Sequence, residues 1–357
     1  MSELADIFIE YGAAYRAKFG HQMLPSHHRV MRAIKQCRTE ALGGRVYHCQ
    51  SCDEDHYRYH SCRNRHCPKC QNGAAESWLA QQSTLLLPVP YFFVTFTLPS
   101  QLRPLAKKHQ KVIYNLLFRA SAAATQQLAA DPRFVGGRIG MIGVLQTWAR
   151  DLTYHPHVHY LVPGGGMTEQ GWRLAKNDFL VHVKPLSILF RAKFRDGLKE
   201  AGLFDQVPAE IWSQPWVVHS QPSGNGKAVL KYLAPYVFRV ALSNNRILKV
   251  ADGQVTFCFQ DSKSGKKRTL TLTAEAFIHR FLQHVLPKGF VKIRYYGFLS
   301  SGNRPRLRQL QALLGLKADP FNTDPVAALA DDLPICPKCG ELLVWVKRLE
   351  PPRNRSP

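Results

Sequence analysis

Three histidines at alternating positions, His155, His157 and His159, form the sharpest local pattern in the sequence. Alternate residues of a β-strand share one face, so His157 and His159 are expected to project together. Two imidazoles at that spacing can bind one divalent metal ion. Gln146, on the strand predicted to precede them, is the first candidate for a third ligand, and Asp151 is the alternative. His155 precedes a proline, and a supporting or substrate-binding role suits it better.

Cysteines supply a second kind of chemistry. Two CxxC pairs, Cys49–Cys52 and Cys67–Cys70, have the spacing of one four-thiolate zinc site. The N-terminal residues do not resemble a secretory signal, so clustered cysteines are expected to bind metal rather than form disulfides. The zinc is expected to be structural, because so short a segment has little core of its own. Further candidate zinc ligands, for this site or a second one, are Cys37, Cys62, His66, Cys336 and Cys339.

Two tyrosines four residues apart, Tyr232 and Tyr236, would share one face of a helix. Tyrosine is a covalent nucleophile in some enzymes, although tyrosines at this spacing are more often packing residues. Pro235 between them would kink the helix. Lys231 and Arg239 flank the pair and are candidates to contact DNA and to favour the phenolate.

The chain is strongly basic: its 357 residues include 48 lysines and arginines against 25 acidic residues, a formal net charge of +23. Such a charge favours a nucleic-acid partner over an anionic membrane or a role in solubility alone. Arg63, Arg65 and Lys69 surround the cysteine pairs and are predicted to contact phosphates. No apolar run is long enough to span a membrane, so a cytoplasmic, DNA-associated protein is expected.

The elements that must position these residues are of mixed type, with short links that favour an antiparallel sheet with flanking helices, class α+β. We expect a zinc-binding and DNA-binding domain in 1–90, a catalytic domain in 91–300, and a tail with a CxxC knuckle in 301–357. Near the histidines, Trp148, Tyr154 and Tyr160 are either stacking platforms for unpaired bases or core residues. Strands are predicted at 91–99, 140–148, 157–166, 246–250, 254–259 and 268–273, and helices at 107–130, 225–239 and 274–286.

Taken together, these pieces resemble a known family. The run HPHVH at 155–159 resembles the HUH motif (histidine, bulky hydrophobic residue, histidine), and YLAPY at 232–236 resembles the paired-tyrosine motif of rolling-circle insertion-sequence transposases. The run SCRNRHCPKCQ at 61–71 is similar to the N-terminal zinc-binding domain of these transposases. SNNRI at 243–247 and RYYGFL at 294–299 also look like family sequence, and the resemblance covers residues from about 11 to about 300.

The resemblance implies an HUH endonuclease-like catalytic domain beside a small zinc-ribbon-like domain. It also implies a mechanism, in which Mg²⁺ or Mn²⁺ on His157, His159 and a third ligand polarises the scissile phosphate. Tyr232 or Tyr236 would attack single-stranded DNA, join the 5′ phosphate and release a 3′-OH. The implied partner is the single-stranded ends of the protein's own mobile element, and the implied process is rolling-circle transposition in a bacterium.

Two alternatives stay open. A plasmid replication initiator or relaxase shares the HUH motif and the same chemistry, although the zinc module favours a transposase. A non-catalytic zinc-containing DNA-binding regulator belongs to a different class of protein. Such a regulator has no need of HPHVH and forms no covalent adduct with DNA.

Overall fold

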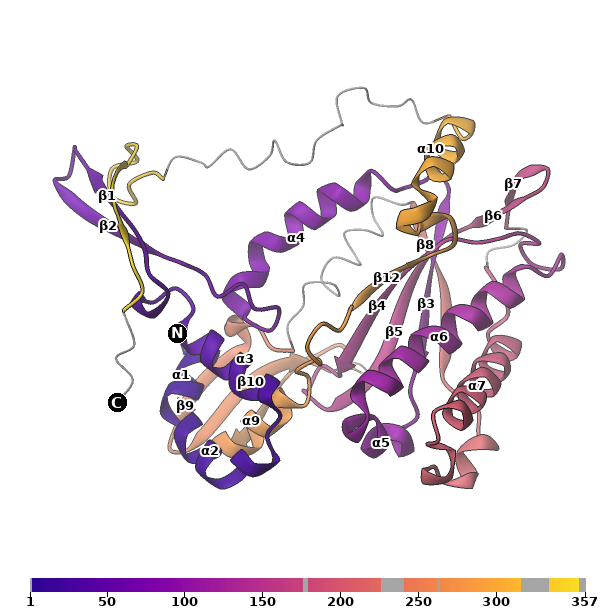
Figure 1. Ribbon diagram of the computed structural model, residues 1–357, viewed down its shortest axis with the longest axis horizontal. Helices are drawn as coiled ribbons and strands as arrows, with labels where there is room; N and C mark the ends of the chain where they lie inside the picture. The colour runs from indigo at the N-terminus through magenta and orange to yellow at the C-terminus, as the bar shows by residue number, and fades with distance from the viewer. Residues whose placement is uncertain (1, 176–178, 226–240, 262–263, 316–333, 353–357) are drawn as a thin grey trace. The chain divides into compact units, whose positions relative to one another are not determined.

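The structure is a computed structural model that describes residues 2–175, 179–225, 241–261, 264–315 and 334–352, with the side chains of 71–77 and 225 left out (Figure 1). The chain forms two compact units, and each is discontinuous in sequence. One unit contains Met1–Ala74, Val240–Val285 and Asp319–Pro357, and the other contains Ala75–Arg239 and Leu286–Ala318. The boundaries expected at 90 and 300 do not coincide with this division, because later strands pair and pack with the N-terminal elements.

A five-stranded sheet organises the unit that contains Ala75–Arg239. Its order is β12-β4-β5-β3-β8, and all its pairings are antiparallel. The strand that carries the histidines, β5, lies at the centre. This arrangement confirms the predicted α+β class. The strands are β3 (Pro90–Thr97), β4 (Met141–Trp148), β5 (Tyr154–Pro163), β8 (Val218–Asn225) and β12 (Ile293–Tyr296).

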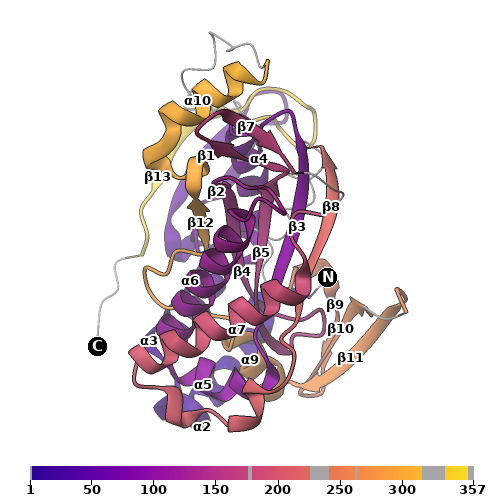
Figure 2. The same ribbon diagram turned by 90° about the vertical axis from the view of Figure 1, so that its right-hand side faces the viewer.

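Both faces of this sheet are covered. Helices α5 (Arg103–Lys108), α6 (Gln110–Ala129) and α7 (Val183–Glu200) lie over one face, as Figure 2 shows. The predicted helix at 107–130 is thus two helices, which meet at His109. On that face Phe96, Tyr160 and Phe118 pack in one apolar core. The opposite face packs with the C-terminal part of α4 (Pro68–Ser83) and with α10 (Arg304–Leu313), while a small hairpin, β6 (Gly165–Thr168) and β7 (Gly171–Leu174), extends the chain after β5.

The three aromatic residues near the histidine motif are core residues. Trp148, Tyr154 and Tyr160 are 8%, 3% and 0% exposed, so they do not offer stacking platforms for bases. Both tyrosine hydroxyls are bonded inside the protein: the Tyr160 hydroxyl lies 2.8 Å from Ser121 Oγ, and the Tyr154 hydroxyl lies 2.6 Å from the Tyr114 hydroxyl. Buried hydroxyls of this kind need such partners, because an unpaired polar group in a core is costly.

The unit that contains Met1–Ala74 also contains a three-stranded meander, β11-β10-β9, which confirms the antiparallel strands predicted between 246 and 273. The turn from β9 to β10 uses Asp252 and Gly253, both with positive φ, as a two-residue hairpin requires. Thr273 Oγ1 accepts a hydrogen bond from the Ala276 N–H and so caps the last helix, as predicted. The elements are α1 (Leu4–Glu10), α2 (Gly12–Phe19), α3 (Pro25–Gln36), β9 (Ile247–Ala251), β10 (Gln254–Gln260), β11 (Lys267–Thr273) and α9 (Ala274–Leu282).

The same unit holds a second three-stranded sheet, of order β13-β1-β2, which we call the zinc-module sheet. It joins the hairpin of β1 (Gly44–Cys49) and β2 (Glu54–Tyr59) to β13 (Val344–Leu349), and both pairings are antiparallel. The segment expected to be a tail therefore contributes a strand to the N-terminal module. Among the described residues, no helix is both long and apolar enough to cross a bilayer.

The hydrogen bond between the buried hydroxyls of Tyr114 and Tyr154 provides a test of the core beside β5. Tyr154→Phe removes the hydroxyl that bonds Tyr114 and leaves a second buried hydroxyl without that bond. We expect the free energy of unfolding to fall by about 1–3 kcal/mol in urea denaturation followed by tryptophan fluorescence. Tyr114→Phe/Tyr154→Phe should cost less than the two single changes added together, because both members of the bond are gone. Additive losses would contradict this account of the pair.

Candidate functional site

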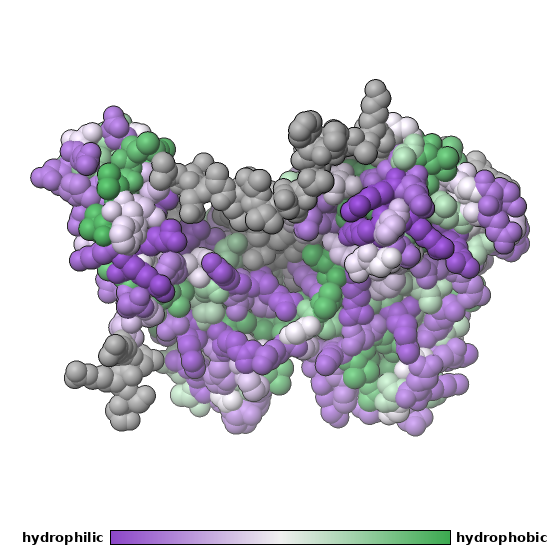
Figure 3. Space-filling model, turned by 45° about the horizontal axis from the view of Figure 1, so that its top comes forward, coloured by the Kyte–Doolittle hydropathy of each residue, from purple (hydrophilic) through white to green (hydrophobic). Residues whose placement is uncertain are grey.

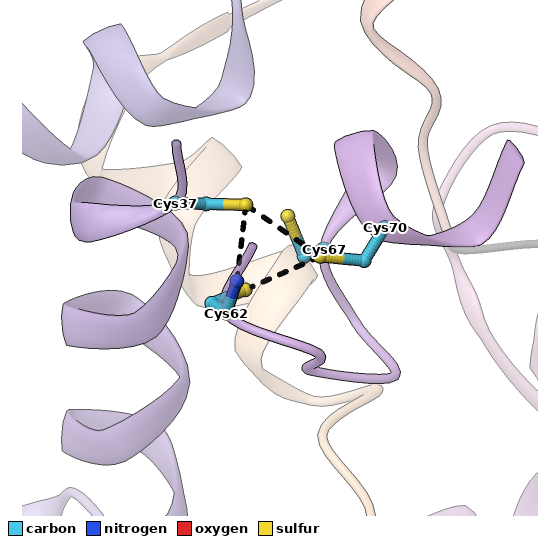
Figure 4. Close-up of side chains that lie close together, drawn as sticks. All are labelled: Cys37, Cys62, Cys67 and Cys70. Atoms are coloured by element: carbon cyan, nitrogen blue, oxygen red, sulfur yellow. Dashed lines mark hydrogen bonds between the residues drawn. The ribbon is translucent and has the colours of Figure 1, made fainter. Parts of the chain in front are cut away.

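Four cysteines converge in the N-terminal module: Cys37, Cys62, Cys67 and Cys70, whose sulfurs all lie within 4.8 Å of one another. They come from the end of α3, from the loop after β2 and from the start of α4 (Figure 4). Cys70 Sγ lies 3.5 Å from Cys37 Sγ and 3.6 Å from Cys62 Sγ. We call this group the base cluster, because Cys62 follows the base of the β1–β2 hairpin, where Gly44 pairs with Tyr59.

A second group consists of Cys49, Cys52, Cys336 and Cys339. Their sulfurs also lie within 4.8 Å of one another. Cys49 Sγ lies 3.5 Å from Cys339 Sγ, and Cys336 Sγ lies 4.0 Å from Cys52 Sγ. His56 Nε2 also approaches Cys336 Sγ at 3.5 Å. We call this group the tip cluster, because Cys49 and Cys52 lie at the tip of the β1–β2 hairpin.

Both clusters fit a tetrahedral zinc ion. Four thiolates about 2.3 Å from Zn²⁺ have sulfurs roughly 3.8 Å apart, and the observed separations of 3.5–4.0 Å bracket that value. Burial raises the pKa of Cys37 to about 11, and a hydrogen bond that the Cys52 thiol donates to Cys339 raises the pKa of Cys52 to about 12. At Cys336 the backbone N–H of Cys339 has the opposite effect and lowers the pKa of the thiol to about 6. A bound zinc ion would replace the protons of Cys37 and Cys52, because the metal ligand is the thiolate. The clusters therefore have the geometry and the donor chemistry of structural zinc sites.

The grouping corrects the prediction of one site built from Cys49, Cys52, Cys67 and Cys70, since each CxxC pair lies in a different cluster. The reason is the length of the hairpin. Gly44 pairs with Tyr59 at its base and Cys49 with Glu54 at its tip, so the two ends are roughly 16 Å apart at about 3.3 Å per residue. Four of the further candidate ligands complete the two clusters, and His66 belongs to neither.

The backbone beside the clusters is constrained. The residue that follows a cluster cysteine has positive φ four times: Arg38 (59°), Asp53 (52°), Arg63 (50°) and Gly340 (79°). For residues other than glycine this conformation costs on the order of 1–3 kcal/mol each, and it persists only where the surroundings fix it. Metal binding is the natural source of that stabilisation in a module with so small a core.

The histidine motif lies on one face of the central strand, as alternation predicts. His157 is directly opposite Gln146 on β4, and His159 is opposite Val144 on β4 and Thr95 on β3. Directly opposed residues of an antiparallel pair point to the same side of the sheet. The imidazole rings of His157 and His159 have their centroids 4.6 Å apart. The structure thus brings the three predicted metal ligands together on one face.

Hydrogen bonds hold both imidazoles in a defined orientation. His157 Nδ1 lies 2.6 Å from the carbonyl oxygen of His155 and must donate to it, which leaves Nε2 with the lone pair that binds metal. His159 Nδ1 lies 2.9 Å from Thr95 Oγ1. Burial lowers the pKa of His157 to about 4 and the pKa of His159 well below its ordinary value. Both rings are therefore neutral at pH 7, the state that a metal requires.

The outer residues of the motif have their own partners. Arg103 Nη2 donates to His155 Nδ1 at 2.8 Å, and burial, with Arg103 beside it, lowers the pKa of His155. The Asp151 carboxylate accepts hydrogen bonds from the backbone N–H and the hydroxyl of Thr153 at 3.0 and 2.7 Å. Sequence reasoning missed Thr95 and Arg103, because their roles depend on strand register and chain folding that no local pattern reveals.

Several predicted DNA contacts remain predictions. Lys69 Nζ forms an ion pair with Glu3 at 2.6 Å, so part of its charge is already balanced within the module. Burial lowers the pKa of Arg65. Arg63 adopts the positive φ described above. The tyrosine pair and its flanking cations, Tyr232, Tyr236, Lys231 and Arg239, lie outside the described residues, as does the helix predicted at 225–239 except for its first residue, which ends β8.

The two clusters predict a definite metal content. Purified protein should contain two zinc ions per chain by atomic emission, one for each cluster. Cys70→Ser and Cys339→Ser should each lose one ion, because each removes a ligand from a different site. Cys258→Ser is the matched control, since Cys258 belongs to neither cluster, and it should keep both ions. A Cys339→Ser protein with two tightly bound zinc ions would rule out the tip cluster as a site.

Comparisons with known proteins agree with the two kinds of site. Residues 7–98 match the family described as "Transposase zinc-binding domain", and residues 140–307 match the family described as "Putative transposase". The first span contains the base cluster and half of the tip cluster, and the second contains the histidine motif.

Two relatives extend over most of the chain. "Putative transposase y4qJ" of Sinorhizobium fredii is 42% identical over 340 residues, which is 88% of this chain and 84% of that protein. "Transposase for insertion sequence element IS801" of Pseudomonas savastanoi pv. phaseolicola is 31% identical over 294 residues, or 74% of this chain and 68% of that protein. The chain therefore belongs to the IS91 family of rolling-circle insertion-sequence transposases, which act on DNA and carry an N-terminal zinc-binding domain.

Proposed function

We propose that this transposase cleaves and rejoins single-stranded DNA through a covalent 5′-phosphotyrosine bond, with a divalent metal ion held by His157, His159 and Gln146. One observation carries the proposal: two neutral, buried imidazoles and an amide side chain share one face of the central strand. A site for a DNA-bound regulator would have no use for ligands desolvated in this way.

The chain's own residues have distinct tasks in this scheme. The two imidazoles and the Gln146 side-chain oxygen would hold Mg²⁺ or Mn²⁺, which when bound supplies positive charge to the scissile phosphate. Thr95 positions His159, and the His155 carbonyl positions His157. His155 and Arg103 stand next to these ligands, and we assign them to contacts with the DNA backbone. Arg63, Arg65, Lys69, Lys231 and Arg239 are the further proposed DNA contacts.

The proposed nucleophile is Tyr232 or Tyr236. The phenolic oxygen would attack the scissile phosphorus and form the bond to the 5′ phosphate, while the bond to the 3′ oxygen breaks and that oxygen takes up a proton. A free phenol with a pKa near 10 is about one part in a thousand ionised at pH 7, a gap of roughly 4 kcal/mol. Lys231 and Arg239 flank the two tyrosines, and their positive charge would lower the free-energy cost of forming the phenolate. The bond to tyrosine conserves the energy for rejoining.

The covalent step is testable on the intact protein. Labelled single-stranded oligonucleotide with Mn²⁺ should give a protein–DNA adduct that survives a denaturing gel. Tyr232→Phe/Tyr236→Phe should abolish the adduct, because each change removes a hydroxyl and little else. His157→Ala should lower the adduct yield by at least about 100-fold through loss of metal, while DNA binding is retained.

Further variants test whether the adduct depends specifically on Tyr232 and Tyr236. Each single Phe variant shows whether one tyrosine acts alone, and Tyr57→Phe changes an exposed tyrosine in the other unit and should leave the adduct unchanged. An adduct formed by the double Phe variant at the rate of the unaltered protein would place the nucleophile elsewhere. A replication initiator or relaxase would give the same adduct, so the family membership is what favours transposition.

The hydrogen bond between Thr95 and the His159 ring gives a finer test, since His159 must donate Nδ1–H to Thr95 Oγ1 if its Nε2 is to bind metal. Thr95→Val keeps the shape of the side chain and removes the hydroxyl that orients His159. Partners of this kind typically contribute 10–100-fold to metal affinity. We therefore expect the Mn²⁺ concentration needed for half-maximal adduct to rise by about 10–100-fold, with the yield restored at saturating metal. An unchanged metal dependence would show that His159 needs no support from Thr95.

A further inference from the structure

Three arginines form one row across the zinc-module sheet. In β1, Arg45 lies directly opposite Arg58 of β2 and directly opposite Arg348 of β13. Opposed residues of antiparallel strands share a face, so the three side chains project to the same side. All three are exposed, and the Arg348 side chain is 69% exposed. At about 4.8 Å between strands, the row places three guanidinium groups along roughly 10 Å.

The next row on this face is aromatic and lies beside the tip cluster. Tyr47 is opposite His56 on one side and Trp345 on the other. Tyr47 is buried against the cluster cysteines, and the Arg58 guanidinium lies 5.8 Å from its ring centroid. Trp345, by contrast, is 59% exposed. Figure 3 shows hydrophilic and hydrophobic side chains side by side on the lobe made by these strands. The face therefore offers cations next to one open indole ring.

Acidic residues offset part of the charge near this face. Glu350 forms an ion pair with Arg348 at 3.1 Å, in which both side chains remain largely exposed. Glu54 is engaged by Lys338 at 2.5 Å, and Asp55 bonds His48, whose strand position points it to the opposite side of the sheet. Three like charges placed directly opposite one another are unfavourable for the isolated sheet. A bound polyanion would remove that cost.

We propose that this face binds single-stranded DNA, with phosphates on the row Arg58–Arg45–Arg348 and an unpaired base stacked on Trp345. A single DNA strand offers a continuous line of phosphates to such a row. An exposed indole beside cations is the combination that stacks a free base, whereas the bases of a duplex are already stacked on one another. The inference rests on the proposed function only in taking single-stranded DNA as the substrate.

The C-terminal CxxC pair holds one strand of this face in place. Cys336 and Cys339 complete the tip cluster, and β13, which begins at Val344, follows them directly. The cluster thereby fixes the strand that carries both Arg348 and Trp345 against the N-terminal hairpin. The DNA-binding face is thus built from two segments that are almost 300 residues apart in the chain, joined by one metal site.

The test measures the salt dependence of binding to a fluorescein-labelled oligothymidylate by anisotropy, with the full chain. Arg348→Gln should lower the slope of log affinity against log salt by about 0.7, and Arg45→Gln/Arg58→Gln/Arg348→Gln by about 2. Lys347→Gln is the matched control, because Lys347 is an exposed cation on the same strand whose side chain lies on the opposite face. It should leave the slope unchanged, and every variant must retain two zinc ions.

A second arm tests the base contact. Trp345→Ala should weaken binding of the oligothymidylate by at least about five-fold and leave binding of a mixed-sequence duplex unchanged. If Lys347→Gln lowers the slope as much as Arg348→Gln does, or if Trp345→Ala weakens both DNAs equally, the face is not a single-strand site and the proposal fails. Adduct formation at saturating DNA is scored separately. Its absence in the unaltered protein would overturn the proposed function while leaving these binding results intact.

Discussion

The register of β5 between β4 and β3 is the constraint on which the histidine face depends. It sets His157 opposite Gln146 and His159 opposite Thr95, and both faces of this strand are covered by packed side chains. A slip of one residue would turn every side chain of the strand to the other face. The histidines would then point into the aromatic core around Tyr160, and the core residues would lie where the histidines now lie. The apolar residues that alternate with the ligands therefore specify where the ligands go.

The same coupling between desolvation and chemistry recurs at the cysteine clusters, with the opposite sign. Burial lowers the pKa of His157 and so keeps its imidazole neutral, ready for a metal, whereas burial raises the pKa of Cys37 and so keeps this thiol protonated until a metal displaces the proton. With zinc bound, the two clusters would stabilise the module at the base and at the tip of one hairpin. The histidine face, in contrast, is held in place by a hydrophobic core on both sides of its sheet. The two kinds of site thus differ in what assembles them.

Local patterns predicted much of this architecture. Alternation predicted that His157 and His159 share a face, and turn and capping residues predicted the meander and the start of α9 at Thr273. The grouping of the cysteines was beyond such reasoning, because CxxC spacing identifies pairs but not which pairs meet. Cys49 and Cys70 belong to different clusters because the β1–β2 hairpin is long enough to hold its tip away from its base. The role of Thr95 and the burial of the aromatic residues near the motif likewise depend on contacts between distant segments, which one sequence does not display.

The tip cluster also sets the order of events during synthesis. Cys52 and Cys336 are 284 residues apart, so at about 5–20 residues per second the ribosome needs roughly 15 to 60 seconds to deliver the second half of the site. During that interval the emerging hairpin carries two unpaired thiols and one open sheet edge along β1, while the sheet around β5 is already being made. Prematurely terminated chains would hold a complete histidine face without a finished zinc module. Such chains would expose the edge of β1, which is a template for pairing with the strand of another chain.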